Sequence, residues 1–339
     1  MLPERALAAF RSALGTDRVF DDTATRALYA SDETPRQVEP DAVLFPASHD
    51  DVAALARIAF EHHIALTPRG AGSGNVGGAL PSPGSAVVSF ECMRRVLEFD
   101  PVNRLIVVEP GVVTDDINRI ARSAGLFYPP DPGSGAYCRI GGNLAMNAGG
   151  PRAVKYGVTR DFVLGLRAVT GSGQEIRTGC RTTKGVTGYD LTRLLIGSGG
   201  TLALITEATL KLLPAPDAVA TLRVCFASSR DALDAVSRVM RQSVMPCALE
   251  FMDHRSIDAI RPTGTADDLP PGTRALLMVE ADGAVQDLPR QIAALQQALD
   301  GNGLLEMKSG FDREAIAQLW AARKSLSLAV KQIAPLKVN

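Results

Sequence analysis

Two glycine-rich segments contain the residues whose types and spacing best suit ligand binding. Residues 67–81 read TPRGAGSGNVGGALP, and residues 140–150 read IGGNLAMNAGG. Glycine allows positive φ angles and lets backbone amides approach an anion closely. We therefore expect the first segment to form a loop that binds a diphosphate. We expect both segments to lie between strands rather than at the start of a helix.

The spacing of Gly72, Gly74 and Gly77 matches the G-x-G-x-x-G pattern of dinucleotide-binding folds. That pattern is informative only where a helix begins inside the glycines, so that its N-terminus faces the pyrophosphate. Residues 77–84 read GGALPSPG, and the prolines and glycines there exclude a helix. The short β-branched run at residues 86–90 then predicts strand–loop–strand, and a Rossmann fold is not expected.

Composition and charge favour a globular protein with two domains. The chain has 339 residues, is 46% hydrophobic and 22% charged, and carries a net charge of −1. This charge favours neither a nucleic acid nor a membrane surface as partner. We find no apolar run of about 18 residues and no signal-peptide pattern. The five scattered cysteines are expected to be reduced thiols of a cytoplasmic protein.

Hydrophobic periodicity and capping residues predict the elements that position the two glycine segments. A first helix should bury Leu7, Phe10 and Leu14. Strands are predicted at residues 43–45, 64–67, 86–90, 105–109, 163–170, 175–178 and 202–213, with helices after Ser48, after Thr114 and at 191–196. Ser48 and Asp51 should form a capping box, and Thr114 should cap its helix.

A second region is predicted to begin after residues 214–216, which read PAP. Strands are predicted at residues 221–226, 248–252, 275–280 and 304–307, alternating with helices at 230–242, 256–260, 288–299 and 313–332. Such alternation predicts a sheet covered by helices, in an α+β domain.

Six stretches, in this order, resemble the flavoproteins of the vanillyl-alcohol oxidase / p-cresol methylhydroxylase (PCMH) type. They are PRGAGSG (68–74), VEPG (108–111), YPPDPGS (128–134), IGGNLAMNAGG (140–150), KYG (155–157) and GSGGTLALITEATLKLLP (197–214). Within that superfamily, the chain is most similar to the D-2-hydroxy-acid dehydrogenases, the group of the glycolate oxidase FAD subunit and the D-lactate dehydrogenases. The family usually has Glu at the place of Gly199 and Gly at the place of Ala203, which leaves the packing on the adenine side open.

The resemblance implies an α+β fold of three parts. Residues 1–39 would form an N-terminal helical segment, and residues 40–216 a PCMH-type FAD-binding domain of two α/β subdomains. Residues 217–339 would form a ferredoxin-like α+β substrate domain, incomplete at its end. FAD would lie between the two α/β subdomains.

The resemblance also implies which residues bind FAD. They are Pro68, Arg69, Gly70, Ala71, Gly72, Ser73, Gly74 and Asn75 around the diphosphate, Pro132, Ser134, Gly141, Gly142, Asn143, Asn147 and Gly149 along the pyrophosphate and flavin ring, and Gly157 and Ile205 at the ring and adenosine ends. Relatives with covalent flavin carry His or Cys at the attachment point. The first glycine loop here has neither, so we expect non-covalent FAD. For Arg69, a solvated loop arginine is the alternative.

At the substrate end, residues 319–325 (LWAARKS) resemble a W-x-x-R motif whose arginine binds the substrate carboxylate. That role would fall to Arg323, with Ser327 one turn further along and Lys337 as a second cation. A guanidinium suits a carboxylate because it can bind it in a bidentate manner. The alternative is that Arg323 is a surface charge of an amphipathic helix. Glu250 is either a site carboxylate or a structural residue at a strand edge.

The four histidines, His49, His62, His63 and His254, are expected to be solvated or capping residues, and no metal site is expected. In the dehydrogenases that the chain resembles, the catalytic base and, in several members, a divalent metal site come from histidines and a glutamate in a further C-terminal stretch. The sequence ends at Asn339 before such a motif, so we expect either a fragment or incomplete chemistry.

The leading hypothesis is an FAD-dependent oxidoreductase that converts a small D-2-hydroxy acid, such as glycolate or D-lactate, to the 2-oxo acid. A hydride would pass to flavin N5, and electrons would leave to a non-NAD acceptor such as a quinone, a cytochrome, or a partner iron–sulfur or second flavoprotein subunit. Through such a partner the protein could reach the inner face of the membrane. Two alternatives stay open: a non-catalytic FAD-binding subunit of a multi-subunit oxidase, and an alcohol or sugar-lactone oxidase of the same fold.

Overall fold

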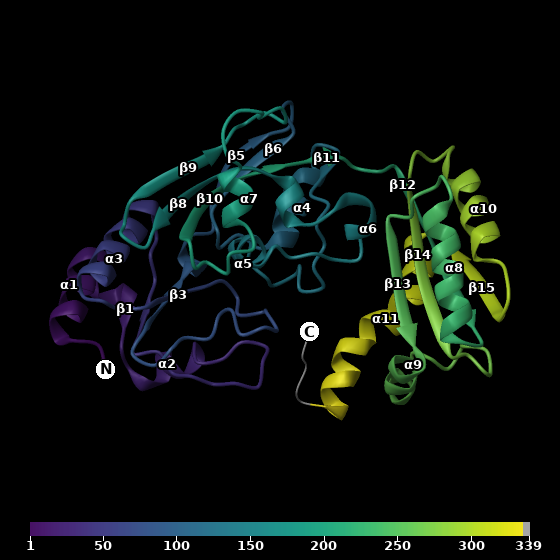
Figure 1. The fold of residues 1–339 in the computed structure, drawn as a ribbon, viewed down its shortest axis with the longest axis horizontal. Helices are drawn as coiled ribbons and strands as arrows, with labels where there is room; N and C mark the ends of the chain where they lie inside the picture. Colours follow the sequence, from purple (N-terminus) through teal and green to yellow (C-terminus); the bar gives the residue numbers. More distant parts are fainter. Residues whose placement is uncertain (335–339) are drawn as a thin grey trace. The chain divides into compact units, whose positions relative to one another are not determined.

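The computed structural model describes residues 1–334, which form two compact units (Figure 1). Of the described residues, the first unit contains Met1–Gly150 and Val158–Ala215, and the second contains Pro151–Gly157 and residues 216–334. A short internal segment of the chain is therefore part of the second unit, although the residues before and after it belong to the first.

The first unit begins with a four-stranded sheet in the order β1-β2-β4-β3. The strands are β1 Val19–Phe20, β2 Ala42–Leu44, β3 Leu66–Arg69 and β4 Ala86–Ser89. Helices α1 (Glu4–Leu14) and α3 (His49–Glu61) share its hydrophobic core, and α2 (Thr23–Leu28) is a short peripheral helix. Leu7, Phe10 and Leu14 are buried, as the periodicity of the first helix predicts.

Strands β3 and β4 are parallel neighbours, and the glycine-rich chain between them contains no helix. The predicted strand–loop–strand order is therefore confirmed. The reason is local, because prolines and glycines in this connection exclude a helical turn.

The two capping predictions have different outcomes. Ser48 is the N-cap of α3 and accepts a hydrogen bond from the Asp51 amide. The capping box is not completed as predicted, because the Asp51 carboxylate bonds to Arg18 and to the Ala47 amide. The Thr114 prediction is wrong: Thr114 is the first residue of α4 (Thr114–Arg122), and its buried hydroxyl accepts a hydrogen bond of 2.6 Å from Asn143.

A second, antiparallel sheet of the first unit has the order β5-β6-β10-β8-β9. Its strands are β5 Val96–Asp100, β6 Leu105–Val108, β8 Val163–Thr170, β9 Glu175–Gly179 and β10 Ala203–Lys211. A small pair of strands, β7 Leu126–Phe127 and β11 Leu213–Pro214, and the helices α4 and α7 (Leu191–Leu195) complete this part. The predicted hairpin around residues 171–173 is confirmed by the pairing of β8 with β9.

The second glycine-rich segment differs from its prediction, because Ile140–Met146 forms the short helix α5. Its apolar residues Ile140 and Leu144 are buried, and Asn147 ends the helix in the left-handed conformation with φ of 50°. Tertiary packing sustains this helix: a Cβ at Gly141 would lie 2.6 Å from Cβ of Pro110. Glycine is a poor helix former, so the sequence pattern favoured a loop.

The second unit has a four-stranded antiparallel sheet in the order β13-β14-β12-β15. Its elements are α6 Ala153–Tyr156, β12 Ala218–Phe226, α8 Ser229–Arg241, β13 Ala248–Asp253, α9 His254–Ile260, β14 Ala275–Gly283, α10 Leu288–Leu299, β15 Leu304–Gly310 and α11 Arg313–Ile333. Helices α8 and α10 share one core with the sheet, whereas α9 and α11 share another with its opposite face. A β-α-β-β-α-β order with this strand arrangement is ferredoxin-like, as the resemblance implies.

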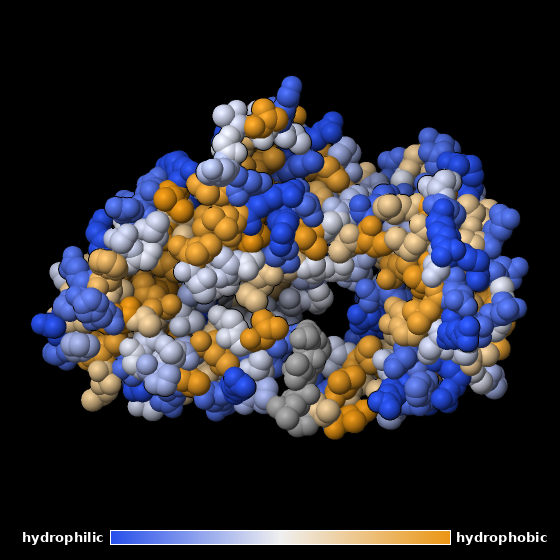
Figure 2. All heavy atoms as spheres, in the orientation of Figure 1, coloured by the Kyte–Doolittle hydropathy of each residue, from blue (hydrophilic) through white to orange (hydrophobic). Residues whose placement is uncertain are grey.

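Short 3₁₀ helices connect several of these elements: η1 Thr16–Arg18, η2 Phe90–Cys92, η3 Thr159–Phe162 and η4 Arg261–Thr263. All five cysteines are free thiols. On the face drawn in Figure 2, hydrophobic side chains occur in small groups between hydrophilic ones. None of the helices in residues 1–334 is both long and apolar enough to span a bilayer.

Candidate functional site

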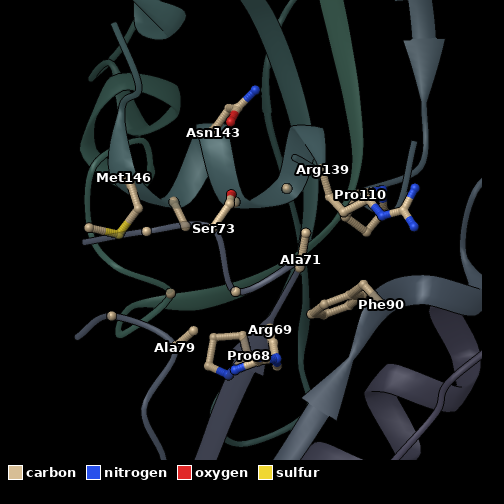
Figure 3. Close-up of a pocket in the computed structure, with 18 of the residues that line it drawn as sticks. Pro68, Arg69, Ala71, Ser73, Ala79, Phe90, Pro110, Arg139, Asn143 and Met146 are labelled. Carbon is tan, nitrogen blue, oxygen red and sulfur yellow. The ribbon is translucent and has the colours of Figure 1, made fainter. Parts of the chain in front are cut away.

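The first unit contains a pocket with about 1010 Å³ of empty space, part of it open to solvent. The loop after β3 and the helix α5 lie next to each other, and both line it (Figure 3). Its lining also includes Phe90, Pro110, Arg139 and Met146. The pocket is therefore formed mainly by the two glycine-rich segments that the sequence pattern singled out.

Glycine gives this pocket walls of bare backbone. Gly72 adopts φ of 66°, where a side chain would be strained. Gly74 and Gly142 also line the pocket, and a Cβ built on either would meet no atom within 4 Å. Such a Cβ would project into open space in the pocket. Backbone amides without side chains can approach a diphosphate closely, so these residues fit the cofactor that the resemblance implies.

The structure brings together 13 of the predicted cofactor-binding residues as lining of this pocket. They are Pro68, Arg69, Gly70, Ala71, Gly72, Ser73, Gly74, Pro132, Ser134, Gly141, Gly142, Asn143 and Ile205. The other four, Asn75, Asn147, Gly149 and Gly157, are not among the lining residues, and Gly157 belongs to the second unit. The binding role of all these residues remains a prediction.

Arg69 is not the solvated loop arginine that was the alternative, because only 9% of the residue is exposed. Its Nη1 donates a 2.7 Å hydrogen bond to the Ser31 carbonyl, and its Cζ lies 5.4 Å from the centre of the Tyr29 ring. A Cβ at Gly72 would lie 2.3 Å from Arg69 Nη2. Burial lowers the pKa of the Arg69 guanidinium. The guanidinium thus supports the glycine loop and is bonded to the N-terminal segment.

The side chain of Asn143 points away from the pocket (Figure 3). Its amide nitrogen donates to Thr114 Oγ1, which in turn lies 3.3 Å from the sulfur of buried Cys138. Asn143 therefore presents its backbone to the pocket and uses its side chain to attach α5 to α4. Sequence reasoning assigned the residue to the site but did not predict this orientation.

Arg139 is a lining residue that sequence reasoning missed. It immediately precedes α5 as the N-cap residue, although its side chain makes no cap hydrogen bond. A Cβ at Gly70 would lie 3.1 Å from Cβ of Arg139, so the two segments are in close contact here. The only sequence signal was position, because Arg139 directly precedes the second glycine-rich segment.

In the second unit, Arg323 and Glu250 are partners. Arg323 Nε donates a 2.7 Å hydrogen bond to Glu250 Oε2, and the Arg323 side chain is 34% exposed. Ser327, one turn later on α11, is exposed. Lys337 lies outside the described residues. Glu250 is therefore a residue of the edge strand β13 that pairs with the candidate carboxylate-binding arginine, and its role as a site carboxylate remains a prediction.

Two further carboxylates of β14 bind side chains of the second unit. Trp320 Nε1 donates a buried 2.7 Å hydrogen bond to Glu280 Oε2, and burial raises the pKa of Glu280. Asp282 accepts a 2.7 Å hydrogen bond from the Tyr156 hydroxyl and forms an ion pair with Lys155. Segment 151–157 is thereby attached to the sheet of this unit. No signal along the sequence predicted either contact.

The expectation that His49 is solvated or capping is wrong. His49 is buried, with Nδ1 2.8 Å from Thr206 Oγ1 and Nε2 3.1 Å from Glu175 Oε2. Burial and the nearby Arg167 lower its pKa. The sequence could not predict this environment of His49, because its partner Thr206 is 157 residues away along the chain. Within residues 1–334 there is no group of three or more His, Cys, Asp or Glu side chains placed to hold a metal ion.

Family models match both units of this chain. The FAD binding domain matches residues 40–179, and the C-terminal domain of FAD linked oxidases matches residues 215–337. The solved structure of p-cresol methylhydroxylase with substrate bound is similar in fold, with a TM-score of 0.81 at 16% identity over 94% of this chain and 70% of that one.

Curated relatives extend the match to most of the chain. The glycolate oxidase subunit GlcD of Bacillus subtilis (strain 168) is 37% identical over 96% of this chain and 69% of its own length. A D-lactate dehydrogenase of Anaerostipes hadrus is 39% identical over 64% of this chain and 46% of its own length. The chain therefore belongs to the FAD-linked oxidases, with a PCMH-type FAD binding domain followed by the C-terminal domain of that family.

Proposed function

We propose that the first-unit pocket binds FAD without a covalent bond, and that the whole protein oxidises a small D-2-hydroxy acid, such as glycolate or D-lactate, to the 2-oxo acid. The observation that carries this proposal is the pocket itself, which is lined largely by the backbone of the two glycine-rich segments. The relatives named for glycolate oxidase and D-lactate dehydrogenase support the substrate class.

Non-covalent binding is supported by the chemistry of the pocket lining. Among the described residues that line it, none is His, Cys or Tyr, the side chains that could attach a flavin. Cys138 is near in sequence, but its buried thiol faces Thr114. The lining thus offers backbone amides, apolar groups, two arginines and the hydroxyls of Ser73 and Ser134 for binding, and none of the side chains that could attach a flavin.

FAD, when bound, would supply a two-electron acceptor for the hydride of the α-carbon. The protein's own task is then to hold the acid. A guanidinium fixed at one nitrogen can present its other nitrogens to a carboxylate. Arg323 has this arrangement, because Nε is bonded to Glu250 and no other described side chain bonds to its two terminal nitrogens. Ser327 and Lys337 would be secondary contacts.

The electron acceptor and the partner follow from the same proposal. The chain spans 69% of the GlcD relative and 46% of the D-lactate dehydrogenase relative, so turnover is proposed for the whole protein. We propose that electrons leave to an iron–sulfur or second flavoprotein subunit rather than to NAD. The protein would act in the cytoplasm, where such a partner could bring it to the membrane.

The test begins with FAD uptake by the purified whole protein, followed by anaerobic addition of glycolate, D-lactate or L-lactate. Bleaching of the flavin absorbance by a D-2-hydroxy acid would support the proposal, with Arg323→Met raising the half-saturating concentration at least about tenfold. Lys324→Met, an exposed neighbour on α11, is the matched control and should change little. FAD uptake without bleaching would favour a non-catalytic subunit, and a chain that takes up no FAD would refute the proposal.

A further inference from the structure

We propose that Arg139 is an anion-binding residue of the first-unit pocket, whose guanidinium binds oxyanions of the bound ligand. The oxyanion would be the diphosphate of the cofactor or the carboxylate of the acid. This inference rests on the proposed function. It adds that the cation which binds the ligand is Arg139, a residue that the sequence pattern did not indicate.

Two arginines line the pocket, and the structure distinguishes them. Arg69, the charged residue of the glycine loop, is already engaged by the Ser31 carbonyl and the Tyr29 ring. Its guanidinium also lies directly against Gly72, on the supporting side of the loop. A bound anion would have to compete with these contacts, so Arg69 acts as a positioning residue for the loop.

Arg139 has the opposite character. It is half-buried, and within residues 1–334 no hydrogen bond or ion pair engages its guanidinium. Its stem is in contact with Gly70, and its side chain extends past Pro110 on the same side of the pocket as Phe90 (Figure 3). The backbone is held here by a bridge between Arg139 and Val113 and by the helix that begins at the next residue.

An unpaired guanidinium beside apolar groups has lost hydrogen bonds to water without gaining others. Partial burial removes water from the charge, and Phe90 and Pro110 offer no acceptor side chain in return. A phosphate or carboxylate restores the lost interactions through short, charge-assisted hydrogen bonds, and Arg is suited to bind either in a bidentate manner. The cofactor diphosphate and the substrate carboxylate would bind a guanidinium in the same way. The experiment must therefore show which of the two Arg139 binds.

The experiment compares Arg139→Gln, Arg139→Lys and the wild type, with Arg119→Gln as control. Arg119 is an exposed arginine of α4 that pairs with exposed Asp116. Binding of ADP and FAD to the apoprotein is measured by competition and flavin fluorescence, and riboflavin serves as the ligand without phosphate. Oxalate binding to the FAD-loaded protein is measured by perturbation of the flavin spectrum.

A diphosphate contact predicts that Arg139→Gln weakens ADP and FAD about tenfold or more, leaves riboflavin unchanged and reduces the salt dependence of FAD binding. A carboxylate contact predicts the same loss for oxalate alone. In either case Arg139→Lys should recover part of the loss, and thermal stability without ligand should not fall. Equal affinities of Arg139→Gln and the wild type for all ligands would overturn the inference, whereas a wild type that binds no FAD would instead defeat the proposed function.

Discussion

The indole nitrogen of Trp320 lies 2.7 Å from Oε2 of Glu280, and both residues are buried. Three residues further along α11, Arg323 is bonded to Glu250 on the neighbouring strand β13. Helix α11 is thus attached to two adjacent strands by two glutamates. This pair of bonds sets the rotation of the helix about its axis, and with it the direction in which Arg323 extends.

Replacing Trp320 by Phe should destabilise the second unit by about 1–3 kcal/mol, because it removes the indole donor from the buried carboxyl group of Glu280. Urea unfolding followed by circular dichroism measures the change. Leu328→Ala on the same helix is the control, since Leu328 is 69% exposed and its loss should cost little. An unchanged midpoint for Trp320→Phe would show that the bond does not hold the helix.

Glu280 should make stability depend on pH. Burial raises its pKa in the folded protein above the ordinary value of 4.5. The unfolded chain therefore releases this proton at lower pH than the folded chain, so the wild type loses stability as pH rises from 4.5 through the folded pKa. Glu280→Gln cannot titrate, and its amide oxygen can still accept from Trp320.

We therefore expect the free energy of unfolding of Glu280→Gln, relative to the wild type, to increase as pH rises above 4.5, the ordinary pKa of the group. Denaturant titrations at several pH values measure it. A difference that stays constant across this range, or that decreases with pH, would contradict the assigned direction of the shift.

Gly72→Ala should destabilise the protein more than the same substitution at a positive-φ glycine that has no close neighbour. The new Cβ would meet Arg69 Nη2 at 2.3 Å in addition to the strain of φ at 66°. Gly84→Ala is matched, because φ is 77° and no atom lies within 4 Å of the new Cβ. The control should cost about 1 kcal/mol in stability, and Gly72→Ala should cost more and also weaken FAD binding. Equal losses would mean that Arg69 is free to move away.

Gly142→Ala should change stability and FAD binding in opposite directions. Gly142 is inside α5 and its new Cβ would meet no protein atom, so the apoprotein should gain up to about 1 kcal/mol from helix propensity. The same methyl group would occupy pocket space and weaken FAD binding. Gly171→Ala, equally open but in the β8–β9 turn, should leave FAD binding unchanged. Unchanged FAD affinity of Gly142→Ala would place the cofactor elsewhere.

Glu250→Ala should weaken oxalate binding to the FAD-loaded protein several-fold, because Arg323 loses the partner that orients it. Arg323→Met should weaken it more, and the double variant should be no worse than Arg323→Met alone. Tighter binding in Glu250→Ala would reverse the interpretation, since Glu250 would then compete with the ligand for the guanidinium.

Much of this architecture follows from local patterns. The strand–loop–strand unit, the hairpin at 171–173 and the alternating elements after residue 216 depend on neighbouring residues alone, because prolines, glycines and apolar periodicity act within a few positions. The family resemblance rested on the same short stretches, and it indicated the segments that line the pocket. It also marked Gly199 and Ala203 as departures, and both are lining residues.

The direction of the polar side chains depends on contacts between distant parts of the chain. Arg69 is turned towards Ser31, 38 residues earlier, and Trp320 finds Glu280 at a separation of 40. The hydroxyl of Thr114 is occupied by Asn143 rather than by its own helix, and α5 is a helix because Pro110 and its buried apolar residues support it. A buried polar group takes whichever partner the fold brings near. Local sequence can therefore indicate where a ligand binds, whereas only the folded chain determines which of two arginines remains free to hold it.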